Sequence, residues 1–231
     1  TGFGLSALAI LAERYRSSRY WRSITPRMAE DRVESILDDI LRIQNNQTVN
    51  PEEYGTNGFL YHFIDAEGRR AINCEVSTVD TALLIAGVLV AGEYFGGDIK
   101  SKADQIYDNV NWSFFVNEFT YQVHMGWKPE PSRGFSQPKG RGFISAQTYD
   151  RPTDEILLIT LLALGSDFES DLLRNSYFSY PREMKTYVAR DDENAGEEYS
   201  VVHSYMGSLF TYLYAHCFFD FEALGPEQTW F

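Results

Sequence analysis

The chain has 231 residues and a formal net charge of −13, from 33 acidic and 20 basic side chains. Its basic residues form no continuous stripe, which argues against binding of nucleic acid and against contact with an anionic membrane. Hydrophobic residues make up 44% of the sequence, so a single folded domain spanning residues 1–231 is expected. Aromatic residues, at 15%, are typical of a rich core and would also suit a sugar-binding groove.

Apolar residues recur with helical spacing in the first part of the chain. The pattern predicts a helix over residues 5–21 and a second over residues 26–44. Thr25 and Pro26 are favourable residues at the N-cap and first position of the second helix. The polar stretch over residues 45–57, which contains Pro51 and Gly55, predicts a loop after it.

A third helix is predicted to begin at Ser77, because Asp80 follows three residues later as in a capping box. Residues 82–91 are apolar on nearly every side, and a helix of that kind must be buried. Gly96 and Gly97 tolerate the left-handed conformation and are expected to end it. The apolar run is shorter than a membrane span, which predicts a core helix and no membrane insertion.

The rest of the sequence predicts an all-α fold of at least six helices, arranged as helical hairpins with long irregular loops and only short strands. Periodicity fails over residues 111–149, and a loop of this length in a compact domain is usually functional. Residues 154–164 predict another apolar helix, and residues 204–219 predict the last one. Residues 176–180 favour a short strand or an extended loop.

Carboxylates at junctions between loops and helices are the candidate chemical groups. Glycoside hydrolysis needs two carboxyl groups beside the scissile bond, one protonated and one ionised. Glu75 precedes the helix cap at Ser77, so capping does not explain it. Asp80 could act in the site or serve only as a capping residue.

Three further acids have weaker signals. Glu130 lies in the aperiodic segment beside Trp127, whose ring could stack on a sugar face or simply anchor the loop. Asp154 and Glu155 lie in the first turn of a predicted helix, where acidic residues are favourable in any case. The two cysteines, Cys74 and Cys217, have no metal-ligand spacing, and a disulfide between them stays open.

Several motifs, in the same order along the chain, resemble the glycoamylase-like family of bacterial carbohydrate-active proteins. The segments that carry the resemblance are residues 2–5, 7–8, 58–63, 75–84, 92–95, 126–130, Glu155 with 161–166, and 209–221. The resemblance implies an (α/α)6 toroid whose active cleft lies where loops enter the inner helices. It also implies action on β-1,2-glucans, as a glucanase or as a domain of a cyclic-glucan synthase.

The resemblance also assigns residues to the cleft. The acidic residues would be Glu75, Asp80 and Glu155, and the residues lining the cleft would be Tyr61, His62, Trp127, Glu130, Asp154 and His216. The helices that precede Gly2 in family members are missing, which implies an incomplete toroid that another chain could complete. On that view the first and last helices should carry exposed apolar patches.

The sequence therefore favours a secreted or periplasmic glycoside hydrolase or transglycosylase that acts on a β-glucan and needs neither cofactor nor metal. A non-catalytic glycan-binding or structural protein with the same fold is the alternative. Two departures from the family pattern bear on this choice. Residues 151–154 replace a Gly-Tyr-Ser-like approach to Glu155, and the segment between Glu130 and Tyr149 is longer and more basic than in the family.

Overall fold

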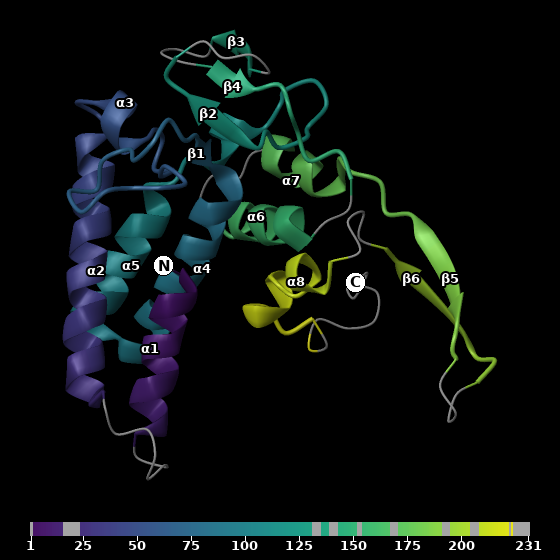
Figure 1. Ribbon diagram of the computed structural model, residues 1–231, viewed down its shortest axis with the longest axis horizontal. Coiled ribbons are helices and arrows are strands. Elements are labelled where there is room, and N and C mark those ends of the chain that lie inside the picture. Colours follow the sequence, from purple (N-terminus) through teal and green to yellow (C-terminus); the bar gives the residue numbers. More distant parts are fainter. Residues whose placement is uncertain are drawn as a thin grey trace.

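The computed structural model describes residues 2–15, 24–130, 135–138, 143–151, 154–166, 171–190, 195–203, 208–221 and 223. This part of the chain is mostly helical with a few short strands, as predicted (Figure 1). Its α-helices are α1 (Gly2–Arg14), α2 (Pro26–Asn46), α3 (Pro51–Tyr54), α4 (Thr78–Phe95), α5 (Gly97–Asp108), α6 (Asp154–Leu164), α7 (Asp171–Phe178) and α8 (Leu209–Tyr212). Two 3-10 helices are η1 (Trp112–Phe115) and η2 (Ala215–Cys217). The strands are β1 (Val76–Ser77), β2 (Gly126–Lys128), β3 (Phe135–Pro138), β4 (Phe143–Ser145), β5 (Met184–Val188) and β6 (Glu198–Val202).

Helix α4 is the central helix and contacts α1, α2, α5 and α6. It begins as predicted, because the Ser77 Oγ accepts a hydrogen bond from the Asp80 N–H at 3.3 Å. It ends at Gly96, whose φ of 70° is the left-handed conformation that glycine adopts without strain. The apolar run over residues 82–91 is helical, and most of it is buried.

Two glycines let α4 pack very closely against its neighbours. A Cβ added to Gly87 would lie 2.1 Å from the carbonyl oxygen of Gly2, at the start of α1. A Cβ added to Gly92 would lie 2.6 Å from the Cβ of Ala103 in α5. The packing of α4 between α1 and α5 therefore depends on the missing side chains at these two positions.

The second half of α4 is less buried than the sequence predicts. Leu89 and Val90 are only partly buried, and Glu93 and Tyr94 are exposed. The helix is also longer than the predicted apolar run, and by length and composition alone it could cross a membrane. In this fold 56% of it is buried inside the protein, and an ordinary core helix meets the same criteria.

Helix α2 follows the prediction closely. Thr25 Oγ1 accepts a hydrogen bond from the Met28 N–H at 3.2 Å, and Pro26 is the first helical residue. The buried stripe of α2 faces α1 and α5 and consists of Ala29, Val33, Leu37, Ile40, Ile43 and Gln44. The predicted loop after α2 contains the short helix α3, which the sequence pattern did not reveal.

Much of the aperiodic segment forms a small antiparallel sheet with strand order β1-β2-β4-β3. In β2, Trp127 pairs with Val76 of β1 on one side and with Ile144 of β4 on the other. The sheet lies beside the N-terminus of α4, because β1 runs directly into that helix (Figure 1). Its strands have only two to four residues, too few to produce a recognisable alternation in the sequence.

Two predictions about the second half of the chain need correction. Residues 176–180 were expected to be extended, but residues up to Phe178 belong to helix α7, whose Leu173 and Ser176 are buried. The predicted helix over residues 204–219 is broken within its described part into α8 and η2. The disulfide that the sequence left open is not formed, because Cys74 is buried, Cys217 is exposed, and both are free thiols. The end of the first predicted helix, residues 16–21, lies outside the described residues.

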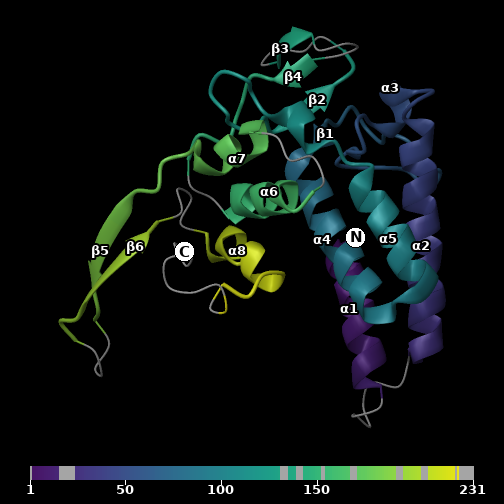
Figure 2. The same ribbon diagram turned by 180° about the vertical axis from the view of Figure 1, so that it is seen from behind.

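Strands β5 and β6 form a hairpin that reaches away from the helices, as both views show (Figures 1 and 2). Exposed apolar side chains also occur on the first and last helices: Phe3 and Ile10 on α1, and Leu209 and Phe210 on α8. A second chain that covers them remains a prediction.

The contact between α1 and α4 gives a matched pair of variants. Gly87→Ala should lower the free energy of unfolding by about 1–3 kcal/mol, because the added methyl group would overlap the backbone of α1. Gly4→Ala is the control, since its Cβ would meet nothing within 4 Å. It should raise stability by up to about 1 kcal/mol. Urea unfolding measures both, and equal effects would contradict the proposed packing.

Candidate active site

Two of the predicted acids meet at one histidine where β1 enters α4. The His62 N–H donates to the Glu75 carbonyl oxygen at 2.9 Å, which places the two residues side by side. His62 Nδ1 lies 3.1 Å from Glu75 Oε1, and His62 Nε2 lies 3.6 Å from Asp80 Oδ2. The three side chains are 36–40% exposed, so the cluster is open to solvent.

Asp80 also belongs to the cap of α4. The Ser77 hydroxyl donates to Asp80 Oδ2 at 2.5 Å while it accepts from the Asp80 N–H. The carboxylate therefore lies at the positive end of the helix dipole, where negative charge is stabilised. Capping and a role in the site are compatible for this residue, because its Oδ2 contacts both Ser77 and His62.

Glu155, in the first turn of α6, has the environment of a general acid. Burial raises the pKa of Glu155 above its ordinary value, and the negative charge of Asp80 raises it further. A hydrogen bond with the Tyr149 hydroxyl opposes this shift. The charge of Asp80 acts on Glu155, so these two acids lie in one electrostatic environment.

Two tyrosines join the acids, and the sequence analysis missed both as site residues. Tyr149 is deeply buried, and burial followed by the charge of Glu155 holds its pKa well above the ordinary range. Tyr214 follows α8, and its pKa is raised by burial and then by the charges of Glu155 and Asp80. Tyr214 lies within the motif 209–221 from which only His216 was chosen, so that motif was the available signal.

Two of the residues predicted to line the cleft, Tyr61 and Trp127, are buried in the core. Tyr61 is buried, and its hydroxyl donates to the carbonyl oxygens of Pro51 and Glu52 at 3.1 and 2.9 Å, which anchors α3. Trp127 is 1% exposed, because its ring is packed in the hydrophobic core. Its ring presents no open face for a sugar, and the alternative role as an anchor describes its position better.

Glu130 takes part in an ion pair that explains its presence. The Arg70 guanidinium contacts both carboxylate oxygens of Glu130 at 2.9 Å, and this hydrogen bonding lowers the pKa of Glu130. Arg70 is 12% exposed, donates to the Cys74 carbonyl oxygen at 2.7 Å and lies over the Tyr61 ring at 5.1 Å. The predicted substrate contact of Glu130 would have to compete with this bidentate pair.

The remaining two predicted residues are His216 and Asp154. His216 is exposed in η2, and its ring packs against Phe221 with centroids 4.8 Å apart. Asp154 begins α6, but its side chain lies outside the described part of the structure. The structure thus unites Glu75, His62 and Asp80 by contact, and Asp80 with Glu155 by charge.

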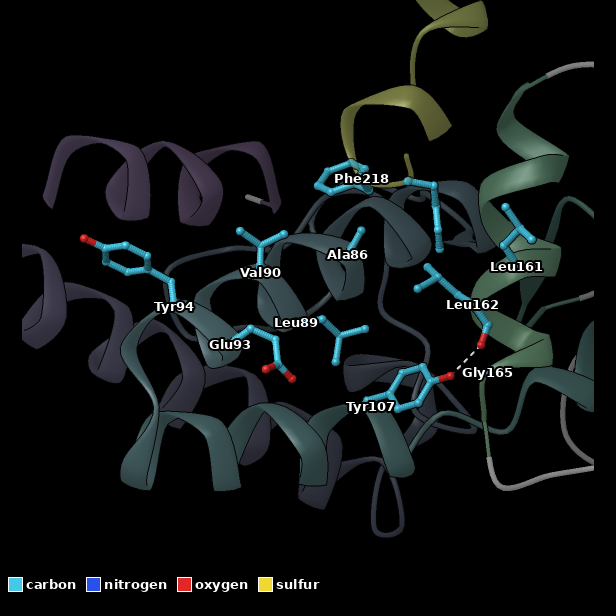
Figure 3. A pocket seen from close by; sticks show the side chains of 11 residues that line it. Ala86, Leu89, Val90, Glu93, Tyr94, Tyr107, Leu161, Leu162, Gly165 and Phe218 are labelled. Carbon is cyan, nitrogen blue, oxygen red and sulfur yellow. Dashed lines mark hydrogen bonds between the residues drawn. The ribbon is translucent and has the colours of Figure 1, made fainter. Parts of the chain in front are cut away.

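A separate pocket of about 700 Å³ lies along the second half of α4 (Figure 3). It is lined by Ala86, Leu89, Val90, Glu93, Tyr94, Tyr107, Leu161, Leu162, Gly165, Phe218 and Phe219. The Tyr107 hydroxyl is already bound to the Leu162 carbonyl oxygen at 2.6 Å, and Glu93 lies 3.2 Å from Lys100 Nζ. Sugar hydroxyls lose hydration in so apolar a space, so the acid cluster is the better candidate for a glycan site.

Within the described ranges, no group of three or more His, Cys, Asp and Glu side chains is arranged to hold a metal ion. Comparisons of the chain with protein-family models, curated proteins and solved structures find no significant match. The family resemblance therefore rests on the sequence motifs, and the function must be argued from the site.

The raised pKa of Glu155 predicts how its removal changes the pH dependence of stability. The pKa of Glu155 is higher in the folded state than its unfolded value of 4.5. Such a carboxyl group stabilises the fold when the pH is below the unfolded pKa. That contribution is lost as pH rises through the folded-state pKa. Glu155→Gln lacks this loss, so its stability relative to the parent should increase between about pH 4 and pH 7.

Urea unfolding at several pH values in that range measures the difference. Glu93→Gln, at the other end of α4, controls for the removal of one negative charge from an exposed position. A difference between Glu155→Gln and the parent that stays constant or falls as pH rises would contradict the assigned environment.

Proposed function

We propose that this chain is a member of the glycoamylase-like family with an (α/α)6 arrangement, and that it is a glycoside hydrolase or transglycosylase. Its proposed substrate is a β-glucan, with β-1,2-glucan as the first candidate. The observation that carries the proposal is the cluster at the starts of α4 and α6. Two carboxylates, Glu75 and Asp80, contact His62, and the third, Glu155, has a raised pKa.

In the proposed reaction Glu155 is the general acid. It transfers its proton to the glycosidic oxygen as the bond to the anomeric carbon breaks, so the leaving sugar departs as a neutral alcohol. Its raised pKa keeps the proton available at a pH where an exposed glutamate has lost it.

Glu75 and Asp80 supply the negative charge on the other side of the reaction. One of them either takes a proton from an attacking water or bonds to the anomeric carbon, and the two routes invert or retain its configuration. His62 contacts both carboxylates and so orients them, and the Ser77 hydroxyl donates a hydrogen bond to Asp80 Oδ2. Neither route requires a metal or an organic cofactor.

The charge of the chain supports a neutral substrate, because a net charge of −13 repels polyanions. A secreted or periplasmic location would give the enzyme access to such a glucan. A glycan-binding protein without catalysis is the second candidate. It is favoured by the burial of Trp127 and the pairing of Glu130 with Arg70, which leave fewer of the predicted substrate contacts available.

Turnover of a panel of β-linked glucans, followed by analysis of reducing ends and product size, tests the proposal. Glu75→Gln should remain folded and lose activity by several orders of magnitude, because a carboxamide supplies no negative charge to the reaction. Glu93→Gln is the matched control and should keep full activity. Normal turnover by Glu75→Gln would remove Glu75 from the mechanism, and binding of a glucan without cleavage by the parent would favour the second candidate.

A further inference from the structure

Phe63 directly follows His62 and stacks on it. The ring centroids are 4.1 Å apart, and the ring planes differ by 13°. The backbone at Phe63 is held in place, because its carbonyl oxygen accepts hydrogen bonds from the Ala71 N–H at 2.9 Å and from the Cys74 thiol at 3.3 Å. Even so, Phe63 is 51% exposed.

The stacking connects Phe63 to the acid cluster. The imidazole of His62 lies beside both carboxylates, with Nδ1 3.1 Å from Glu75 Oε1 and Nε2 3.6 Å from Asp80 Oδ2. Phe63 stacks on this imidazole and so places an aromatic ring next to the side chain that contacts both carboxylates. An exposed, immobilised aromatic ring beside carboxylates combines the apolar and polar surfaces that a pyranose ring presents.

We propose that Phe63 is a sugar-binding platform, on which one pyranose ring of a neutral glucan packs its C–H face. That residue packs on the face of Phe63 opposite His62, and the neighbouring residue of the glucan then brings its glycosidic bond to Glu75 and Asp80. This inference rests on the proposed function and adds to it the residue that positions the substrate. A sugar fits this place better than an apolar partner, which would strip water from the two carboxylates without replacing their hydrogen bonds.

The test measures affinity separately from chemistry. In the Glu75→Gln background, calorimetry with a short β-1,2-linked gluco-oligosaccharide gives the Kd without turnover. Phe63→Ala and Phe63→Leu should each weaken binding about tenfold, since both remove the ring and the second keeps apolar bulk. Phe63→Tyr keeps the ring and should bind within about threefold of its parent.

With Glu75 intact, Phe63→Leu should raise KM more than it lowers kcat, as expected for a contact made equally in the ground state and the transition state. The control is Phe119→Ala, which removes a 92% exposed phenylalanine from the turn between Val116 and Val123. It should change neither Kd nor KM. Circular dichroism establishes that each variant is folded before its affinity is interpreted.

The outcomes separate the two proposals. Unchanged affinity in both Phe63→Ala and Phe63→Leu overturns the platform, while cleavage of the glucan by the parent leaves the enzyme proposal standing. If the parent cleaves no β-glucan and the Glu75→Gln protein binds none, the platform falls together with the proposed function. Should Phe63→Ala fail to fold, the comparison of Phe63→Leu with Phe63→Tyr decides the question.

Discussion

Helix α4 lies so close to α1 and α5 that a methyl group at Gly87 or Gly92 would overlap a neighbouring atom. These two contacts fix the helix along its axis as well as in its rotation. They also fix its N-terminus, where Asp80 lies roughly two turns before Gly87. Because β1 runs directly into that terminus, the position of Glu75 follows from the same packing. The acid cluster is therefore held by backbone contacts made well away from it.

The three acids of the cluster, Glu75, Asp80 and Glu155, differ in their local environments. Asp80 accepts a hydrogen bond from the Ser77 hydroxyl at the start of α4, and Glu75 contacts His62. Glu155 is in a different environment, in which burial and the nearby charge of Asp80 both raise its pKa. Each acid also begins or precedes a helix. Position in the first helical turn alone would favour ionisation of Glu155, and here burial prevails over that preference.

The parts of the fold that the sequence predicted are those governed by local chemistry. Thr25 with Pro26, and Ser77 with Asp80, are capping patterns that act within one turn of helix, and both are found in the structure. The small sheet escaped prediction because its strands are shorter than one cycle of reliable alternation. Helix α7 escaped because only Leu173 and Ser176 are buried in it, so its apolar stripe is weak.

In the candidate site too, contacts between residues close in sequence could be predicted, and contacts between distant residues could not. Glu75 and Asp80 are five residues apart around a helix start, and their proximity could be predicted from that spacing. The ion pair of Glu130 joins residues sixty positions apart, and no pattern in the sequence indicates that Arg70 is its partner. Trp127 was expected on a cleft wall, but its ring is packed in the hydrophobic core.

The packing of α1 also reaches the site through aromatic rings. Phe3, next to the contact between Gly2 and Gly87, lies 6.2 Å from Tyr214 and 5.6 Å from Phe218 by ring centroid. Tyr214 in turn is close enough to Glu155 and Asp80 for their charges to raise its pKa. One end of α1 therefore fixes α4 and also supports the tyrosine that faces the acids of α4 and α6. The cluster is formed by segments far apart in the sequence, and its geometry therefore depends on the crossing of α1 and α4.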